Sequence, residues 1–154
     1  MTIEQFIKKG FAKTVERLFD LDKFKFERII ITQDVIDNII ILARENHPKE
    51  FLAFFDGKIE NKKLMITGLL YQEYNANEHS AAPIFRFPTS TFYGSIHSHP
   101  GFSNRPSSAD RQFFRKTGII NAIICMPYNK ENIRFYNHEG EEITVEIEHN
   151  NDIE

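Results

Sequence analysis

The 154-residue sequence contains no tryptophan and a single cysteine, Cys125. One cysteine cannot form a disulfide within the chain, so the composition does not favour an exported, disulfide-stabilised protein. No apolar run reaches the roughly 20 residues that a membrane-spanning helix needs, and Glu4 interrupts the place of a signal peptide. We therefore expect a soluble, cytoplasmic protein without a membrane partner.

The sequence also lacks a basic cluster, a glycine-rich phosphate loop and an internal repeat. Its 19 Lys and Arg against 22 Asp and Glu give a net charge of −3. A weakly acidic chain without a basic stripe is a poor nucleic-acid binder, so we expect no nucleic-acid partner. A hydrophobic fraction of 41%, with fifteen phenylalanines, is enough for one core in a chain of this length.

Apolar patterning predicts a mixed α/β domain with one main sheet flanked by helices. A strong helix is predicted over 33–46, with Thr32 as its N-cap, and a hairpin follows with Asp56-Gly57 as its turn signal. Residues 72–83 are polar and irregular and are expected to form a loop. The predicted strands cover 26–31, 51–55, 63–71, 84–87, 92–97, 119–126, 132–137 and 143–147.

Two histidines follow the aromatic and β-branched segment 92–96, which favours a strand. Side chains alternate along a strand, so His97 and His99 point the same way, with Cα atoms about 6.6 Å apart, while Ser98 points to the opposite face. Two imidazoles in this arrangement can both reach one zinc ion at the usual Zn–N distance of about 2.0–2.1 Å. The pair is therefore a candidate metal site.

A helix is predicted to begin shortly after the histidines. Pro100 stops the strand, the following turn residues reverse the chain, and Ser107 or Ser108 can cap a helix that ends before Gly118. Asp110 then lies in the first helical turn, where it can serve as a third metal ligand or simply favour the helix dipole. Three protein ligands leave one tetrahedral position open, which is typical of catalytic zinc.

The pattern H-x-H-P-x6-S-x2-D resembles the JAMM motif of the MPN-type zinc metalloproteases, which include prokaryotic and archaeal JAB-like isopeptidases. The resemblance covers roughly residues 29–137 and implies a single-domain MPN/JAB-like fold, similar to that of cytidine deaminases. It implies that His97, His99 and Asp110 bind one Zn²⁺ per chain. It also implies that Glu50 is the general base for the zinc-bound water and that Ser107 helps to hold the oxyanion. The sequence departs from the family before the histidines, where it has no room for the helix that many relatives have.

By this resemblance, we expect hydrolysis of peptide or isopeptide bonds at the C-terminal tail of a ubiquitin-like or sulfur-carrier protein. The tail is expected to lie as a strand added to a sheet edge. Two alternatives remain open. One is a non-catalytic MPN-type scaffold or binding module, and the other is a RadC-like protein acting in DNA metabolism.

From this resemblance we expect two parts: an N-terminal helical extension, residues 1–28, and a JAMM/MPN-like catalytic domain, residues 29–154. The apolar stripe over 3–19 is expected to pack on the domain, with a homodimer contact as the alternative. Cys125 is expected to be a buried core residue with a raised pKa. The other histidines are expected to be surface residues: His47, His79, His138 and His149.

Overall fold

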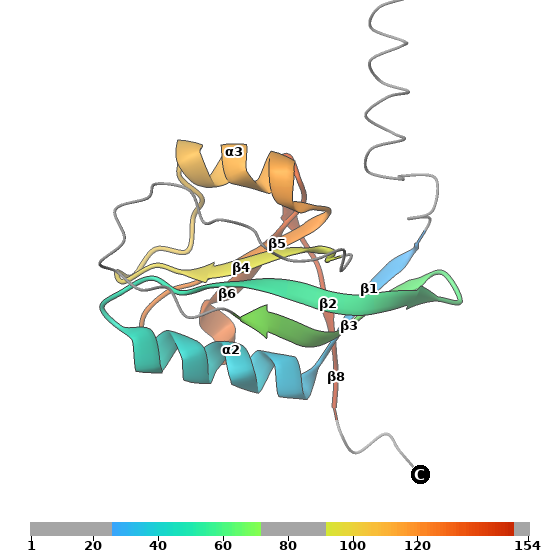
Figure 1. The fold of residues 1–154 in the computed structure, drawn as a ribbon, viewed down its shortest axis with the longest axis horizontal. Coiled ribbons are helices and arrows are strands. Elements are labelled where there is room, and N and C mark those ends of the chain that lie inside the picture. The colour runs from blue at the N-terminus through green and yellow to red at the C-terminus, as the bar shows by residue number, and fades with distance from the viewer. Residues whose placement is uncertain (1–25, 72–91, 150–154) are drawn as a thin grey trace, which may run out of the picture.

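The computed structural model describes residues 26–71 and 92–149. Within them, helices lie between groups of strands along the chain, as in a mixed α/β domain (Figure 1). The two α-helices are α2 and α3, and a short 3₁₀ turn precedes β6. The elements are β1 (Arg28–Thr32), α2 (Gln33–Asn46), β2 (Leu52–Glu60), β3 (Lys63–Tyr71), β4 (Gly94–Ser98), α3 (Ser108–Thr117), β5 (Ile120–Ile124), η1 (Lys130–Asn132), β6 (Ile133–Tyr136), β7 (Glu142–Ile143) and β8 (Glu146–Glu148).

All eight described strands form one mixed sheet, in the order β7-β6-β5-β4-β2-β3-β1-β8. Strand β4 pairs antiparallel with β2 and parallel with β5, so it lies inside the sheet. The two end strands, β7 and β8, are separated in the chain by only Thr144 and Val145. Because two residues span only about 10 Å of chain, the sheet must curl until its ends approach each other.

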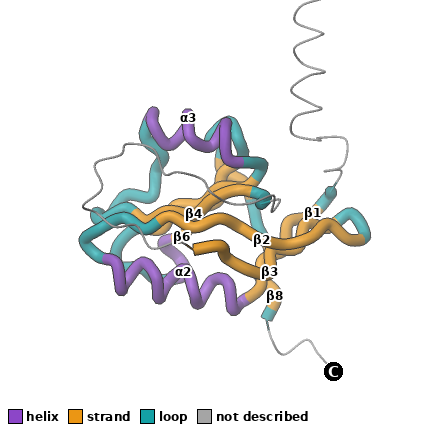
Figure 2. The backbone as a smooth tube through the Cα atoms, viewed as in Figure 1, coloured by secondary structure: helices purple, strands orange, loops and turns teal. Residues whose placement is uncertain are grey.

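The two helices cover opposite faces of this curled sheet (Figures 1 and 2). On one face, α2 places its buried side chains in the main core. On the other face, Phe114 of α3 packs with Ile123 and Tyr136 in a smaller cluster. The α2 residues in the main core are Val35, Ile36, Ile39 and Ala43. The sheet thus has two buried faces, and this explains why β4 and β5 are buried along their whole length.

The mixed α/β class, the single main sheet and helix 33–46 agree with the predictions from sequence. Thr32 is at the N-cap position of α2, but its side chain makes no capping hydrogen bond. The predicted N-terminal helical stripe, the loop 72–83 and the strand 84–87 lie outside the described residues. No helix in the described ranges is long and apolar enough to cross a membrane.

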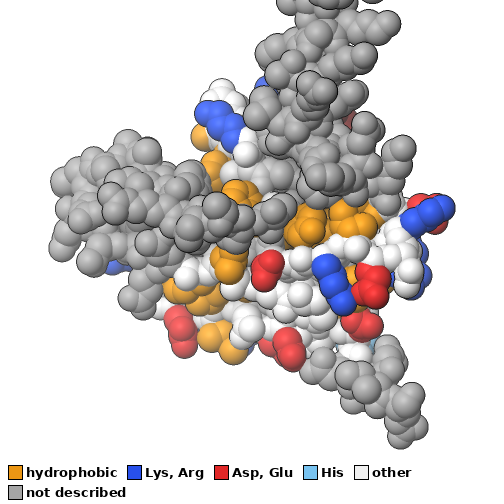
Figure 3. All heavy atoms as spheres, turned by 45° about the vertical axis from the view of Figure 1, so that its right-hand side comes forward, with side chains coloured by type: hydrophobic (Ala, Val, Ile, Leu, Met, Phe, Trp, Pro, Cys, Tyr) orange, Lys and Arg blue, Asp and Glu red, His pale blue; other side chains and the backbone are white. Residues whose placement is uncertain are grey.

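The prediction that Asp56-Gly57 forms the hairpin turn is wrong. Strand β2 continues through this dipeptide, where the register with β3 shifts as in a β-bulge. A Cβ atom on Gly57 would lie 2.0 Å from the Met65 carbonyl oxygen, so glycine permits a close approach of the two strands. The turn is made by Asn61 and Lys62, both with positive φ. Charged side chains lie on this side of the molecule (Figure 3), and Lys58 pairs with Glu60 at 2.8 Å.

The predicted strand 143–147 is also divided in the structure. Glu142–Ile143 pairs antiparallel with β6, whereas Glu146–Glu148 pairs parallel with β1 at the other end of the sheet. The apolar alternation of these residues correctly predicts an extended backbone. It cannot indicate that the chain changes its partner strand, because strand pairing here depends on the curl of the whole sheet.

Candidate metal centre

Strand β4 positions the two histidines of the candidate site. His97 is the fourth of its five residues and is only 7% exposed, and His99 follows directly after the strand. The amide of His99 still donates to the carbonyl of Ile124 in β5, at 2.8 Å, so the backbone remains fixed beyond the assigned end of β4. The imidazoles therefore project from a rigid backbone at the centre of the sheet.

Helix α3 supplies the carboxylate. Ser107 is the N-cap, and its Oγ accepts a hydrogen bond from the Asp110 amide at 3.1 Å. In return, Asp110 Oδ2 accepts from the Ser107 amide at 2.7 Å. This reciprocal capping box satisfies two free N–H groups of the helix terminus and fixes the Asp110 side chain. The helix ends at Gly118, the position that the sequence predicted, and Gly118 has a φ of 133°.

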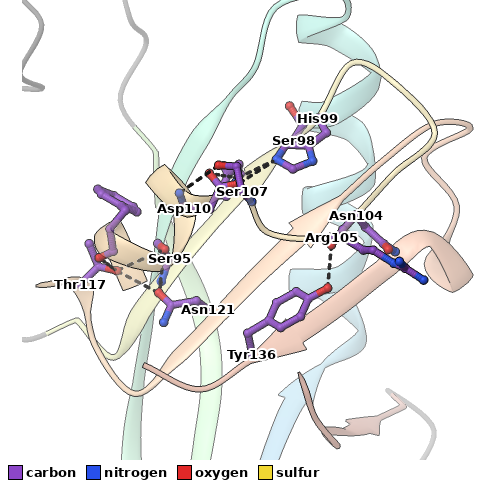
Figure 4. A network of polar contacts seen from close by, with 12 residues as sticks. Ser95, Ser98, His99, Asn104, Arg105, Ser107, Asp110, Thr117, Asn121 and Tyr136 are labelled. Carbon is purple, nitrogen blue, oxygen red and sulfur yellow. Dashed lines mark hydrogen bonds and ion pairs between the residues drawn. The ribbon is translucent and has the colours of Figure 1, made fainter. Parts of the chain in front are cut away.

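The structure brings the three predicted ligands together. The Nε2 atoms of His97 and His99 are 3.1 Å apart, and the Asp110 carboxylate lies 3.1 Å from the first and 3.3 Å from the second. Figure 4 shows Asp110 and His99 directed toward each other across the gap between α3 and the end of β4. Two ligand atoms of a tetrahedral zinc ion with bonds of about 2.0–2.1 Å are about 3.3 Å apart. The observed separations therefore fit such an ion.

The protonation of His99 supports the same conclusion. Its Nδ1 lies 2.8 Å from the carbonyl oxygen of Ser103. A carbonyl can only accept, so Nδ1 carries the proton and a neutral ring has a lone pair at Nε2. That lone pair faces Asp110 Oδ2 at 3.3 Å and His97 Nε2 at 3.1 Å. Electron-rich atoms this close repel one another unless a proton or a metal ion lies between them.

The carboxylate itself is held in its charged form. Burial raises the pKa of Asp110, but hydrogen bonds from His97 and from the backbone of Ser107 outweigh this effect. The net result is a pKa of Asp110 well below its usual range. A charged carboxylate beside two imidazoles is a donor set that suits a divalent ion such as zinc.

Glu50 lies at the mouth of the β2–β4 pair. Leu52 is opposite His97 in this antiparallel pair. Glu50 and His99 lie beyond the paired residues, and the same register continued by two residues predicts that they face each other. Because directly opposed residues share a face of the sheet, this register predicts Glu50 on the face that carries the candidate ligands. Its side chain is exposed.

Two buried hydroxyl groups connect the Glu50 segment to the histidine segment, and sequence reasoning missed both. Ser98 Oγ accepts from the amide of Phe51 at 2.9 Å. The hydroxyl of Tyr128 lies 2.8 Å from Nδ1 of His47 and donates to the carbonyl of His99 at 3.3 Å. Burial raises the pKa of Tyr128, and the charges of Cys125 and Glu50 raise it further, so the hydroxyl keeps its proton. The only sequence signal was the Ser between the histidines.

The remaining predicted residues behave as expected where the structure describes them. His47, His138 and His149 are exposed, while His79 lies outside the described residues. Cys125 is 3% exposed, and burial raises its pKa. Within the described ranges, the only group of His, Cys, Asp or Glu residues that could hold a metal is His97, His99 and Asp110.

A curled mixed sheet between two helices, with this His-His-Asp cluster where β4 meets the start of α3, defines a metalloprotease-like domain. The chain belongs to the family of prokaryotic homologues of the JAB domain, whose model matches residues 32–139. This match starts at the N-cap of α2 and includes Glu50, the two histidines and Asp110. The family resemblance inferred from the motif is thereby confirmed.

Relatives with known names or structures agree with this assignment. A probable metalloprotease of Haloferax volcanii is 28% identical over 127 residues, covering 75% of this chain and 76% of the relative. The crystal structure of a JAB1/MPN domain protein from Archaeoglobus fulgidus is 28% identical, with a TM-score of 0.62, over 76% of this chain and 96% of the other. A structure described as JAMM, a metalloprotease-like zinc site in the proteasome and signalosome, is 27% identical, with a TM-score of 0.61, over 79% of this chain and 99% of the other.

Proposed function

We propose that the protein is a zinc-dependent metalloprotease that hydrolyses peptide or isopeptide bonds at the C-terminal tail of a ubiquitin-like or sulfur-carrier protein. The observation that carries this proposal is the convergence of three ligand atoms from His97, His99 and Asp110 within 3.1–3.3 Å of one another. A carboxylate on the same face, that of Glu50, completes the set of groups that metal-assisted hydrolysis requires.

Glu50 has the role of general base and then of general acid. A zinc ion held by the three ligands would lower the pKa of a water at its open position to about 7 and polarise the carbonyl to be attacked. Glu50 accepts the proton that the attacking water loses. It then donates this proton to the nitrogen of the departing amine, so that the carboxylate is regenerated for the next turnover.

We assign to Ser107 the role of stabilising negative charge on the carbonyl oxygen. Its Oγ already accepts the hydrogen bond from the Asp110 amide, and its hydroxyl proton can be donated to another group. The capping box holds the Oγ atom of Ser107 in place. Comparable oxyanion donors contribute about 10²–10³ in rate.

The position of the site within the sheet restricts where a substrate tail can lie. Strand β4 already has β2 and β5 as neighbours, so a tail cannot pair with β4. The end strands β7 and β8 are three and four strands away in the sheet order, which corresponds to about 14 and 19 Å. We therefore place the tail beside segment 100–106, which leads from His99 to Ser107 outside the strand ladders.

Phe102 in this segment offers an apolar contact to a substrate. Its side chain is 79% exposed, although its neighbours are fixed. The carbonyl of Gly101 accepts from the Met126 amide at 2.9 Å, and the carbonyl of Ser103 lies 2.8 Å from His99 Nδ1. An exposed aromatic ring on a segment whose backbone is hydrogen-bonded, three residues after His99, is well suited to bind an apolar residue of the substrate.

The test is cleavage of fusions in which candidate ubiquitin-like and sulfur-carrier proteins carry an extension after the terminal glycine. We expect cleavage after that glycine, inhibition by a chelator, and restoration by zinc. Glu50→Gln should retain one zinc per chain and lose about 10²–10⁴ in kcat, because it cannot transfer the proton. His97→Ala and Asp110→Ala should lose the metal, which elemental analysis of the purified variants measures.

The same experiment separates the alternatives. If Glu50→Gln cleaves as fast as the parent, the role of Glu50 is wrong. If the parent binds zinc but cleaves no fusion, the MPN-type scaffold becomes the better assignment. Chelator-insensitive cleavage would refute the metal mechanism, and tight binding to DNA in place of cleavage would favour the RadC-like alternative.

A further inference from the structure

A cluster of buried polar side chains lies beneath the C-terminal end of α3, apart from the metal ligands (Figure 4). We call it the anchor cluster. It joins β4, α3 and β5, and its members are Ser95 at 0%, Thr117 at 5% and Asn121 at 0% exposure. None of these side chains is needed for the hydrolytic steps described above, so their burial requires another explanation.

The hydrogen bonds of the anchor cluster converge on one amide oxygen. Asn121 Oδ1 accepts from the Ser95 amide at 3.2 Å and from Ser95 Oγ at 2.8 Å. Thr117 Oγ1 lies 2.9 Å from the same oxygen and 3.0 Å from the carbonyl oxygen of Phe113, so its one proton is shared between these two acceptors. Asn121 Nδ2 donates to the carbonyl of Gly118 at 3.1 Å. A satisfied buried network adds little stability compared with apolar packing of the same shape. Its directional bonds, however, fit only one placement of α3 on the sheet.

That placement is the one that brings the ligands together. Ser95 precedes His97 by two residues and so lies on the same face of β4. Thr117 follows Asp110 by seven residues, which is two helical turns, and so lies on the same side of α3. The contact between α3 and β4 therefore has the anchor cluster at one end and the ligands at the other. Between them, the ring of Phe114 lies 6.2 Å from that of His97.

A small slide of α3 would separate the ligands. One helical turn corresponds to about 5.4 Å along the axis, whereas Asp110 and His97 are within 3.1 Å of each other. The capping box orients Asp110 relative to its own helix, but it does not fix α3 relative to β4. The apolar contacts of Phe114 are not directional and tolerate small shifts. Among the described residues, the anchor cluster supplies the side-chain hydrogen bonds between the C-terminal end of α3 and strands β4 and β5. It acts together with the backbone bonds from Ile119 and Ile120 to the carbonyl of Tyr93.

We propose that the anchor cluster sets the register of α3 on β4 and thereby determines the affinity and coordination geometry of the metal centre. Its three members are positioning residues. This inference rests on the metal binding in the proposed function and does not depend on the substrate or on proteolysis.

The test uses two matched threonines. Thr117→Val removes the hydroxyl that is shared between Asn121 Oδ1 and the Phe113 carbonyl and keeps the shape of the side chain. Thr32→Val is the control, because Thr32 Oγ1 is buried and has no hydrogen-bond partner among the described residues. Thr117→Ser keeps the hydroxyl and should restore the parent behaviour, and Ser95→Ala is a second variant of the cluster. Zinc affinity is measured by competition with a chromogenic chelator, and coordination by the visible spectrum of the Co²⁺ form.

We expect Thr117→Val and Ser95→Ala to bind zinc about 10-fold more weakly than the parent, near the lower end of the range for residues that orient ligands. Their Co²⁺ spectra should change, while Thr32→Val and Thr117→Ser keep the parent affinity and spectrum. Parent-like affinity and spectra for both cluster variants would overturn the proposal. An equal loss of affinity in Thr32→Val would also overturn it, because the effect would then be one of general stability.

A metal-free measurement keeps this result separate from the proposed function. Nuclear Overhauser effects between the rings of Phe114 and His97 report the α3–β4 register without zinc. They should weaken in Thr117→Val and remain in Thr32→Val. If the parent binds no zinc, the proposed function fails, while loss of these signals in Thr117→Val still supports the anchor. If the signals are unchanged in Thr117→Val, the anchor is refuted whatever the parent binds.

Discussion

Replacing Ser98 by alanine tests how the Glu50 segment is held against the histidine strand. Ser98 is 1% exposed, and its Oγ accepts from the amide of Phe51 at 2.9 Å. In the other direction, the Ser98 amide donates to the Phe51 carbonyl at 3.1 Å. The hydroxyl therefore completes the last rung between β2 and β4, next to Glu50. Ser98→Ala leaves a buried amide without its acceptor.

The expected loss of stability follows from this one group. Leaving a buried donor unsatisfied costs about 1–3 kcal/mol. For a domain of this size, 1 kcal/mol shifts Tm by about 2–4 °C, so metal-free Ser98→Ala should melt about 2–12 °C below the parent. Ser108→Ala is the control, because Ser108 is exposed at the start of α3 and should shift Tm little.

Hydrogen exchange locates the effect. In Ser98→Ala, the amide of Phe51 should exchange at least about 10-fold faster, since it loses its bond, while the amide of Ser98 keeps its own acceptor. If Tm changes by less than about 1 °C and the Phe51 amide stays protected, then another acceptor replaces the hydroxyl. The reasoning about this rung would then be refuted.

Three further changes test other parts of the structure. Tyr128→Phe should lower the free energy of unfolding in urea by about 1 kcal/mol. His47→Ala should lower it less in the Tyr128→Phe background than in the parent, because both substitutions remove the same hydrogen bond. Additive losses would contradict that link. Native Cys125 should react with iodoacetamide at least about 100-fold more slowly than in urea, because burial hides the thiol and raises its pKa; equal rates would exclude a buried thiol. Gly57→Ala should destabilise the hairpin by about 2 kcal/mol or more, whereas Gly68→Ala, whose Cβ would meet nothing closer than 3.7 Å, should be tolerated. Equal melting temperatures for the two glycine variants would contradict the close approach at the bulge.

Local sequence patterns were sufficient to predict structural features that a single segment determines. Alternation along a strand placed His97 and His99 on one face, and the S-x2-D spacing placed a cap and its acid at the start of α3. The same reasoning failed at Asp56-Gly57, because a bulge and a turn favour the same residues. It also failed at 143–147, where two short strands join opposite ends of the sheet.

The sequence by itself determined the mixed α/β class, the family and the residues proposed as ligands, because each depends on neighbours along the chain. The tertiary structure alone decided that Asp110 reaches both histidines, that Leu52 pairs with His97, and that two buried hydroxyls connect the Glu50 segment to the histidine segment. These contacts join residues that are far apart in the chain, from β2, β4, α3 and the segment after β5. Their distances follow from the curl of the sheet and the packing of α3 on it, which no local pattern encodes.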